Sequence, residues 1–365
     1  MNINNKVIWQ QAAGDTDRDY SDLCLKWDVI LNGPGYAGKW PECKLPLKKN
    51  HWSARKISDL RRFCEDVKEG DLIVLRLGTT DILGVGEVVG QYQWLEEFGD
   101  VDGWDLQHVR RVRWFWKGLN KPKKFPAYSL KLGDTTQKLD SKDVSEWIKS
   151  LDIPKETFGR NIVELPSCKH KSPITYEEIS EYLFDQGVAS NSIEHLLREI
   201  DELIRIAKWY KKFQNPSERE TIAYLVVPLL RALGWTPQKM AIEWSNVDLA
   251  LFDRLPRSDG SLSVVVEAKK KDKSCLTAQS QAQSYAQGKQ GCRRLVVTDG
   301  LRYGIYIRNE GVFSLYAYMN LTDLKDEYPI YGCYGVKEAL RAMTPEWGGS
   351  NIQNSTPSTL LPDQL

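Results

Sequence analysis

The sequence predicts a multidomain protein of the α+β and α/β classes. We expect a small β-barrel with a helix packed on it over residues 1–150 and a mixed α/β domain over residues 214–343. Three observations predict this: the 365 residues suffice for about two domains, short apolar runs fill the first part, and helical and strand-like segments alternate in the second. A linker (151–174) and a helical connector (175–213) separate the domains, and the tail (344–365) is expected to be disordered.

The composition is that of an ordinary globular chain. It is 41% hydrophobic and 27% charged, with a formal net charge of +1. These values exclude a disordered tail protein and a supercharged nucleic-acid coat, so any nucleic-acid surface must be a local patch.

The seven cysteines are scattered and form no CxxC pair, and there are only four histidines. Neither a zinc site nor a disulfide framework is predicted. The first residues lack the basic and apolar regions of a signal peptide, and no apolar run approaches the roughly 18 residues of a membrane span. We therefore expect a cytoplasmic protein that has no membrane partner.

Short runs rich in Val, Ile and aromatic residues predict strands in the first domain, because each run ends at turn residues. They cover residues 27–31, 71–77, 83–92 and 109–116. Residues 53–67 are predicted to be the one clear helix of this domain, with Ser53 as its N-cap. Together these elements predict a strongly curved barrel with a helix packed on it.

The connector is predicted to be helical. Between residues 193 and 207, apolar side chains recur at three-and-four spacing with charged residues between them, which is typical of an amphipathic helix. We expect this stripe to pack on the following domain. The alternative is a homodimer seam over residues 192–213.

The second domain alternates helices and strands, which predicts a mixed α/β core around a central sheet. The expected order is helix 218–233, strand 247–252, strand 262–268, helix 277–288, strand 294–298 and strand 302–308.

Polar side chains interrupt two of these strands. Asp248 lies in one, and the next strand ends in Glu267 and Lys269 after a run of three valines. Because side chains alternate along a strand, Glu267 and Lys269 share a face. Carboxylates from adjacent strands can share a Mg²⁺ ion, while a lysine beside them orients or deprotonates water and stabilises developing negative charge.

Two helices add polar residues to the same place. Gln281 and Tyr285 lie four apart, on one helical face, where an amide and a phenol can contact a phosphate or a base. Glu218 lies in the first turn of the helix that precedes the strands, where it can supply a third carboxylate, and Glu220 is an alternative in the same turn.

Residues 217–308, about a quarter of the chain, resemble a PD-(D/E)xK nuclease core of the branch found at the amino end of type I restriction-enzyme motor subunits. The resemblance implies phosphodiester hydrolysis with Mg²⁺, for which Mn²⁺ can substitute. It implies metal ligation by two carboxylates, catalysis by four residues and support by two more. Those residues are Asp248 and Glu267 for the metal, the same pair with Lys269 and Glu218 for catalysis, and Gln281 and Tyr285 for support. The alternative is a strand-end salt bridge in an inert α/β domain.

The lysine run that follows the strand is usually a solvated face. Lys270 and Lys271 are also candidates to hold a DNA backbone, because clustered lysines commonly contact phosphates. By contrast, the phosphate-loop-like segment 33–39 is rejected: Trp40 replaces the Ser or Thr that would hold Mg²⁺, and Pro34 removes a backbone donor. No nucleotide cofactor is expected.

Residues 67–89 are similar to a strand pair of PUA-like domains, the superfamily of the EVE and YTH modules. The resemblance implies nucleic-acid binding and an aromatic-lined pocket for a modified or flipped base. Candidate residues are Trp27, Trp40, Trp52, Trp94 and Trp104, with Lys48, Lys49 and His51 beside two of them. We expect two or three of these tryptophans to line a pocket and the others to fill the core.

The combined expectation is a DNA endonuclease in which the first domain recognises a modified base and the second cleaves, as in a modification-dependent restriction enzyme of phage defence. The expected partner is DNA carrying a modified base, and a homodimer is an open alternative to a monomer. Two other readings remain: a nuclease for unmodified DNA or RNA with the first domain as sensor, and a nucleic-acid-binding protein with an inactive nuclease fold.

Overall fold

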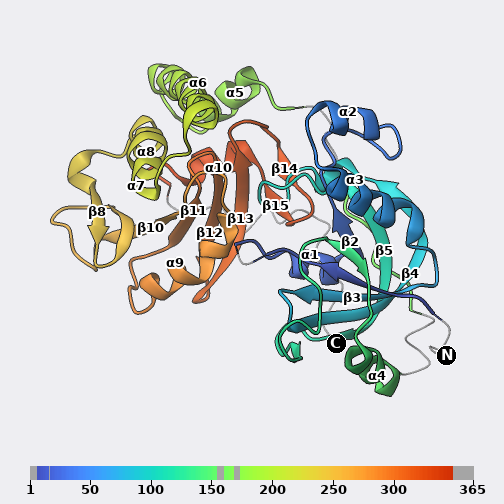
Figure 1. The fold of residues 1–365 in the computed structure, drawn as a ribbon. Coiled ribbons are helices and arrows are strands. Elements are labelled where there is room, and N and C mark those ends of the chain that lie inside the picture. The colour runs from blue at the N-terminus through green and yellow to red at the C-terminus, as the bar shows by residue number, and fades with distance from the viewer. Residues whose placement is uncertain (1–5, 16, 154–159, 168–172, 348–365) are drawn as a thin grey trace. The chain divides into compact units, whose positions relative to one another are not determined.

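The computed structural model describes residues 6–15, 17–153, 160–167 and 173–347. The chain divides into two units, Met1–Ser167 and Cys168–Leu365 (Figure 1). Each is described by itself. The boundary lies inside the predicted linker, of which residues 154–159 and 168–172 are outside the described residues.

The first unit is built on one mixed sheet. Its strands are β1 (Ile8–Ala12), β2 (Val29–Asn32), β3 (Leu72–Leu77), β4 (Asp81–Trp94), β5 (His108–Lys117), β6 (Lys123–Lys124) and β7 (Thr136–Lys138). The order is β2-β5-β4-β3-β1-β7, with β6 beside β4, and β1 runs parallel to β3. Among the described strands, β2 and β7 stand at the two ends of this path and do not pair with each other, so the sheet is a curled half-barrel (Figure 1). The predicted strongly curved barrel is therefore confirmed in its curvature but not as a complete barrel.

The curl of the sheet is explained by β4. Its pairing with β5 is shifted twice, between Val85 and Gly86 and between Val89 and Gln93, and such bulges bend a strand. Glycine is required at position 86, because a Cβ there would lie 2.6 Å from Cγ1 of Val112. The sequence therefore lets β5 and its side chains approach β4 closely at the bend.

The α-helices that accompany this sheet are α1 (Ser21–Lys26), α2 (Lys44–Lys49), α3 (Ala54–Arg61) and α4 (Lys142–Ser150). Helix α3 continues as a π-helical turn, Arg62–Asp66, so the predicted helix is confirmed, and Ser53 Oγ accepts from the backbone N–H of Lys56 as its cap. The prediction that this is the one clear helix of the first domain is wrong. Helices α1 and α2 are six residues each, too short to show helical periodicity in the sequence.

The second unit contains a larger mixed sheet. Its strands are β8 (Met240–Trp244), β9 (Val247–Phe252), β10 (Leu262–Ala268), β11 (Arg294–Thr298), β12 (Arg302–Asn309), β13 (Val312–Asn320), β14 (Glu327–Tyr328) and β15 (Cys333–Tyr334). The order is β14-β15-β13-β12-β11-β10-β9-β8. Strands β10 and β11 are parallel, and β9 is antiparallel to β10. The predicted mixed α/β architecture with a central sheet is confirmed.

Helices cover both faces of this sheet (Figure 1). They are α5 (Tyr176–Asp185), α6 (Ser190–Phe213), α7 (Glu218–Thr221), α8 (Val227–Ala232), α9 (Gln279–Ala286) and α10 (Val336–Ala342). Helix α7 continues through a π-helical turn, Ile222–Val226, into α8. One core joins α5, α6, α8 and α10 to one face of the sheet, and a second joins α9 to the other.

The apolar stripe of α6 is buried within its own unit. Ile193, Leu196, Ile200 and Leu203 all lie in the core that covers one face of the sheet. The stripe therefore packs on its own domain, as expected, and is not available as a homodimer seam.

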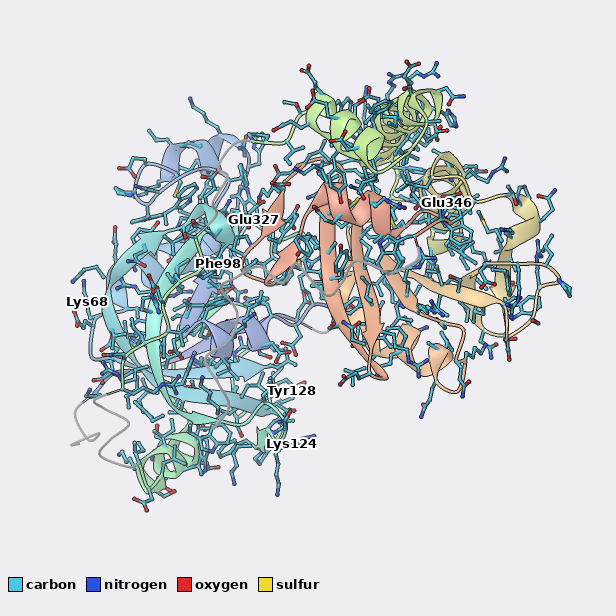
Figure 2. The ribbon with its side chains drawn as sticks, turned by 180° about the vertical axis from the view of Figure 1, so that it is seen from behind. Lys68, Phe98, Lys124, Tyr128, Glu327 and Glu346 are labelled. Carbon is cyan, nitrogen blue, oxygen red and sulfur yellow. The ribbon has the colours of Figure 1, made fainter. Side chains whose placement is uncertain are left out.

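The disordered tail is predicted to begin at residue 344, which is too early in the chain. Thr344 is buried, and its carbonyl oxygen accepts a 2.8 Å hydrogen bond from the guanidinium of Arg294, which anchors the backbone there. Glu346, labelled in Figure 2, is exposed. Residues 348–365 lie outside the described residues.

Within the described residues, no helix combines the length and the apolar character needed to cross a membrane.

Candidate functional site

The two predicted metal-binding carboxylates lie on neighbouring antiparallel strands of the second unit. Leu249 of β9 pairs with Val266 of β10, which makes Asp248 and Glu267 the next neighbours along the two strands. Asp248 Oδ2 accepts a 2.8 Å hydrogen bond from the backbone N–H of Ala268, which holds this carboxylate against the end of β10. The structure therefore brings together the two side chains that the sequence predicted.

Glu267 is 2% exposed, and its carboxylate is only partly satisfied. Oε1 accepts a hydrogen bond from Lys269 Nζ at 3.1 Å, whereas the buried Oε2 has no hydrogen-bond partner among the described residues. Burial, and then the charge of Asp248, raise the pKa of Glu267 to about 7, although Lys269 opposes the shift. A buried carboxylate with an orphaned oxygen beside a second carboxylate is a place that a cation would stabilise.

Lys269 is fixed between two partners. Its Nζ lies 3.1 Å from Glu267 Oε1 and donates a 2.9 Å hydrogen bond to Gln281 Oε1. The Gln281 amide in turn donates to the hydroxyl of Tyr285 at 3.2 Å, one turn further along α9. These contacts use two of the three ammonium N–H groups and leave the third for a water or a phosphate oxygen.

The structure distinguishes Glu218 from Glu220. Glu220 Oε2 accepts from the backbone N–H of Ser217, and Ser217 Oγ accepts from the N–H of Glu220, so Glu220 closes a capping box at the start of α7. These hydrogen bonds lower the pKa of Glu220. Glu218 is exposed, and its negative charge contributes to the raised pKa of Glu267, which places it on the side of the carboxylate pair.

The chemistry of these donors fits Mg²⁺. Among the described residues, no three His, Cys, Asp or Glu side chains are grouped to hold a metal ion. Mg²⁺ does not require such a group, because it keeps several waters and usually takes one or two carboxylates from the protein. Asp248 and Glu267 supply that number of hard oxygen ligands, and the orphaned Glu267 Oε2 is a free lone-pair donor.

The lysine run after β10 is not a uniform solvated face. Lys270 is exposed, as expected for a residue that contacts a DNA backbone. Lys271 is not: its side chain is 2% exposed and its ammonium forms a 2.6 Å ion pair with Asp272. The prediction that Lys271 contacts DNA is therefore corrected, because tight packing and a partner carboxylate occupy its charge.

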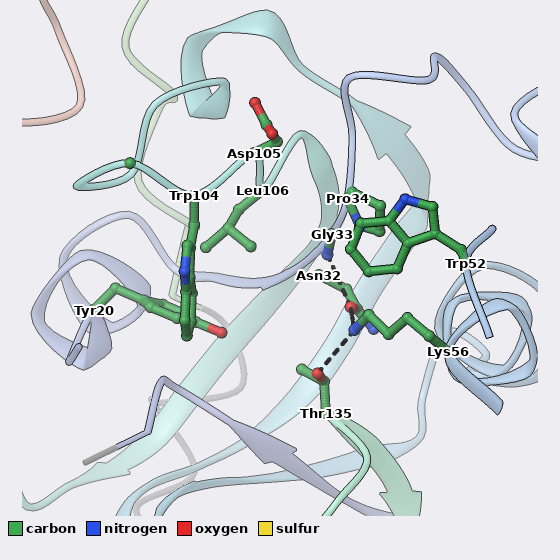
Figure 3. A pocket seen from close by; sticks show the side chains of 11 residues that line it. Tyr20, Asn32, Gly33, Pro34, Trp52, Lys56, Trp104, Asp105, Leu106 and Thr135 are labelled. Atoms are coloured by element: carbon green, nitrogen blue, oxygen red, sulfur yellow. Dashed lines mark hydrogen bonds between the residues drawn. The ribbon is translucent and has the colours of Figure 1, made fainter. Parts of the chain in front are cut away.

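A cavity of about 280 Å³ opens in the first unit (Figure 3). Trp52 and Trp104 lie on opposite sides of it, with Tyr20 next to Trp104. The lining residues are Tyr20, Asn32, Gly33, Pro34, Trp52, Lys56, Gly103, Trp104, Asp105, Leu106 and Thr135. Its volume lies just below the roughly 300–1,000 Å³ of ligand pockets, so it suits a ligand of the size of one ring system.

Lys56 fixes the floor of the cavity. Its ammonium donates to Asn32 Oδ1 and Asp59 Oδ2 at 3.0 Å and to Thr135 Oγ1 at 3.2 Å, which uses all three donors. The buried carboxylate of Asp59 neutralises the charge. The floor therefore presents a positioned hydrogen-bonding surface in which the charge of the lysine is already paired.

The Gly-Pro-Gly turn after β2 forms one wall. A Cβ at Gly33 would lie 2.3 Å from the carbonyl oxygen of Asp105, and one at Gly35 would lie 2.0 Å from Gln107 Oε1, so only glycine fits either position. Gly35 N–H also donates to the Asp105 carbonyl at 3.0 Å. The segment thus serves as a tightly packed turn.

Two of the five predicted tryptophans line the cavity. Trp27 and Trp40 are buried elsewhere, and Trp40 Nε1 donates to Glu65 at 2.7 Å. Trp94 Nε1 donates to the Gly35 carbonyl and so supports the turn from outside the cavity. Lys48, Lys49 and His51 are exposed and do not line the cavity, so their predicted contact with nucleic acid stays a prediction.

Sequence reasoning missed the polar lining. Tyr20 precedes α1, Asn32 ends β2, Lys56 lies in α3 and Thr135 precedes β7, and no local pattern links them. The available signals were the Asn-Gly-Pro-Gly turn at 32–35 and the Trp-Asp pair at 104–105, each of which places polar groups beside an aromatic wall.

Comparison with known proteins adds one match. A family described as a domain of unknown function (DUF8426) matches residues 9–136, about a third of the chain, and this span contains every residue that lines the cavity. No curated protein matches the chain.

Proposed function

We propose that this protein is a Mg²⁺-dependent DNA endonuclease whose second unit hydrolyses phosphodiester bonds and whose first unit recognises a modified base. The observation that carries the proposal is the buried Glu267 beside the half-buried Asp248, with Lys269 fixed next to them. Among the described residues, Oε2 of Glu267 has no hydrogen-bond partner. A buried, partly unsatisfied carboxylate beside a second carboxylate is costly to a fold and is expected where charge is used for chemistry.

The residues have separable roles in this proposal. Asp248 and Glu267 would hold Mg²⁺, which when bound polarises a phosphoryl oxygen and acidifies a bound water. Lys269 directs its remaining N–H toward the attacking water or the phosphate oxygen that gains charge. Gln281 and Tyr285 hold the ammonium in place, and Glu218 supplies a further carboxylate at the edge of the site.

The cavity of the first unit supports a base reader. Two tryptophans on opposite sides suit a planar group, and base–aromatic stacking is worth about 1–3 kcal/mol per base. Because Asp59 neutralises Lys56, the floor favours an uncharged ring with polar edges over a phosphate. A base taken out of the stack has those properties. Restriction of modified, foreign DNA in phage defence is the role that such a combination serves.

The experiment is cleavage of matched DNA substrates that carry ordinary, methylated, hydroxymethylated or glucosylated cytosine, with Mg²⁺ and with Mn²⁺. The Lys269→Ala protein is the control, because it keeps the carboxylates and should bind DNA without cutting it. Cutting confined to a modified substrate supports the proposal and names the ligand. Equal cutting of all substrates supports the nuclease without the reader, and retained cutting by Lys269→Ala contradicts the assigned site.

A further inference from the structure

The carboxyl end of α6 carries two exposed aromatic rings that the fold does not use. Trp209 and Phe213 are 57% and 63% exposed, and their ring centroids are 5.3 Å apart. The buried face of the same helix end consists of Leu203, Ala207 and Tyr210. Large aromatic side chains gathered in water are the kind of exposed apolar patch that marks an interaction site.

Three lysines surround these rings. Lys208, Lys211 and Lys212 are exposed, and Lys212 Nζ lies 5.3 Å from the ring centroid of Phe213. Within the chain that the structure describes, none of the three forms an ion pair with an acidic side chain, and at spacings of three and four they repel one another. The helix dipole favours cations at a carboxyl end, which explains the lysines but not the exposed rings.

A short segment of chain joins this surface to Glu218 of the carboxylate site. Phe213 precedes Glu218 by five residues, and a fully extended chain of that length spans at most about 18 Å. That is about five steps of 3.4 Å along one strand of DNA.

Electrostatic coupling also connects the surface with the site. Burial, and then the charges of Glu220 and Tyr224, raise the pKa of Tyr210. The pKa of Glu220 is lowered, first by its hydrogen bonds to Ser217 and then, to a smaller extent, by the positive charge of Lys270. These interactions indicate that the end of α6 lies near the start of α7, and that the start of α7 lies near the exposed Lys270.

We propose that this lysine–aromatic surface binds an unpaired stretch of nucleic-acid strand next to the carboxylate site. The surface consists of Lys208, Trp209, Lys211, Lys212, Phe213 and Lys270. The lysines contact phosphates, and unstacked bases stack on the two rings, the combination by which proteins hold single strands without reading sequence. Bases inside an intact duplex cannot reach the rings. The inference deepens the proposed function and rests on it for the substrate class.

The test is binding of a fluorescein-labelled oligothymidine by the full-length protein in EDTA, measured by fluorescence anisotropy. We expect the Trp209→Ala/Phe213→Ala protein to bind about 5- to 150-fold more weakly for each ring that stacks on a base. Phe184→Ala is the matched control, because Phe184 is a 62% exposed aromatic on α5 of the same unit, and it should bind like the wild type.

The lysines are tested by salt dependence. Lys211→Gln/Lys212→Gln should lower the slope of log Kd against log salt concentration by about 0.7 for each of these lysines that neutralises a phosphate. Lys149→Gln is the matched control, since Lys149 lies in the last turn of α4 as Lys212 does in α6. It should leave the slope unchanged.

Unchanged affinity in the folded double aromatic variant overturns the inference. So does sedimentation showing that the wild type is a dimer and the variant a monomer, because the rings would then cover a second copy. Absence of cleavage on every DNA, together with weakened oligothymidine binding in the variant, would remove the proposed nuclease and leave this binding surface standing.

Discussion

Replacing Glu267 with glutamine is expected to stabilise the metal-free protein at pH 8 and to change its stability little at pH 4. Burial, and then Asp248, raise the pKa of Glu267 from 4.5 to about 7 in the folded chain. Between these values the unfolded chain has released a proton that the folded chain still holds. The stability contributed by the protonated side chain is therefore complete below pH 4.5 and is lost as pH rises through about 7.

The magnitude follows from the shift. A rise from 4.5 to about 7, at about 1.36 kcal/mol per pKa unit, corresponds to about 3 kcal/mol at pH 8. Glutamine has nearly the same shape and no charge, so the variant avoids this cost. For a unit of about 200 residues, the gain corresponds to a rise of roughly 6–12 °C in Tm.

The assay is thermal unfolding in EDTA at pH 4 and pH 8, with Glu194→Gln, an exposed glutamate on α6, as the matched control. Adding Mg²⁺ at pH 8 should raise the Tm of the wild type more than that of Glu267→Gln, because the variant lacks one ligand. A variant no more stable than the wild type at pH 8, or equally stabilised at both pH values, would refute the reasoning from burial.

Two further predictions concern the acidic residues at the start of α7 and the cavity of the first unit. Glu220→Gln should weaken the capping box, lower the free energy of unfolding by about 1 kcal/mol or less and leave cleavage intact. Glu218→Gln should slow cleavage without changing the free energy of unfolding. Cleavage assays and urea unfolding measure both effects, and the reverse pattern would exchange the roles of the two residues. Trp104→Ala should reduce the preference for modified over unmodified DNA, measured as the ratio of initial cleavage rates. His51→Ala, at an exposed residue that does not line the cavity, should leave this ratio unchanged. An unchanged ratio in Trp104→Ala would place base recognition elsewhere.

Several features were predictable because they depend on residues close together in the chain. Alternation along a strand puts Glu267 and Lys269 on one face, and their 3.1 Å contact follows. Helical spacing joins Gln281 to Tyr285. Ser53 caps α3 through the backbone N–H of Lys56, three residues away.

Other features depend on residues that only the folded chain brings together. Lys56 donates a hydrogen bond to Thr135, which is 79 residues away, and to Asn32, which is 24 residues away, and these contacts build the floor of the cavity. Lys271 and Lys270 are adjacent in the sequence, yet one is buried against Asp272 and the other is exposed.

The sequence by itself determined the periodic elements, the caps and the carboxylate–lysine pattern, since propensity and spacing act over a few residues. Only the tertiary structure decided that the first sheet stays an open half-barrel, which tryptophans face the cavity, and that Glu267 is shielded from water. Burial and electrostatic environment are properties of packing between distant segments, and no local pattern encodes them.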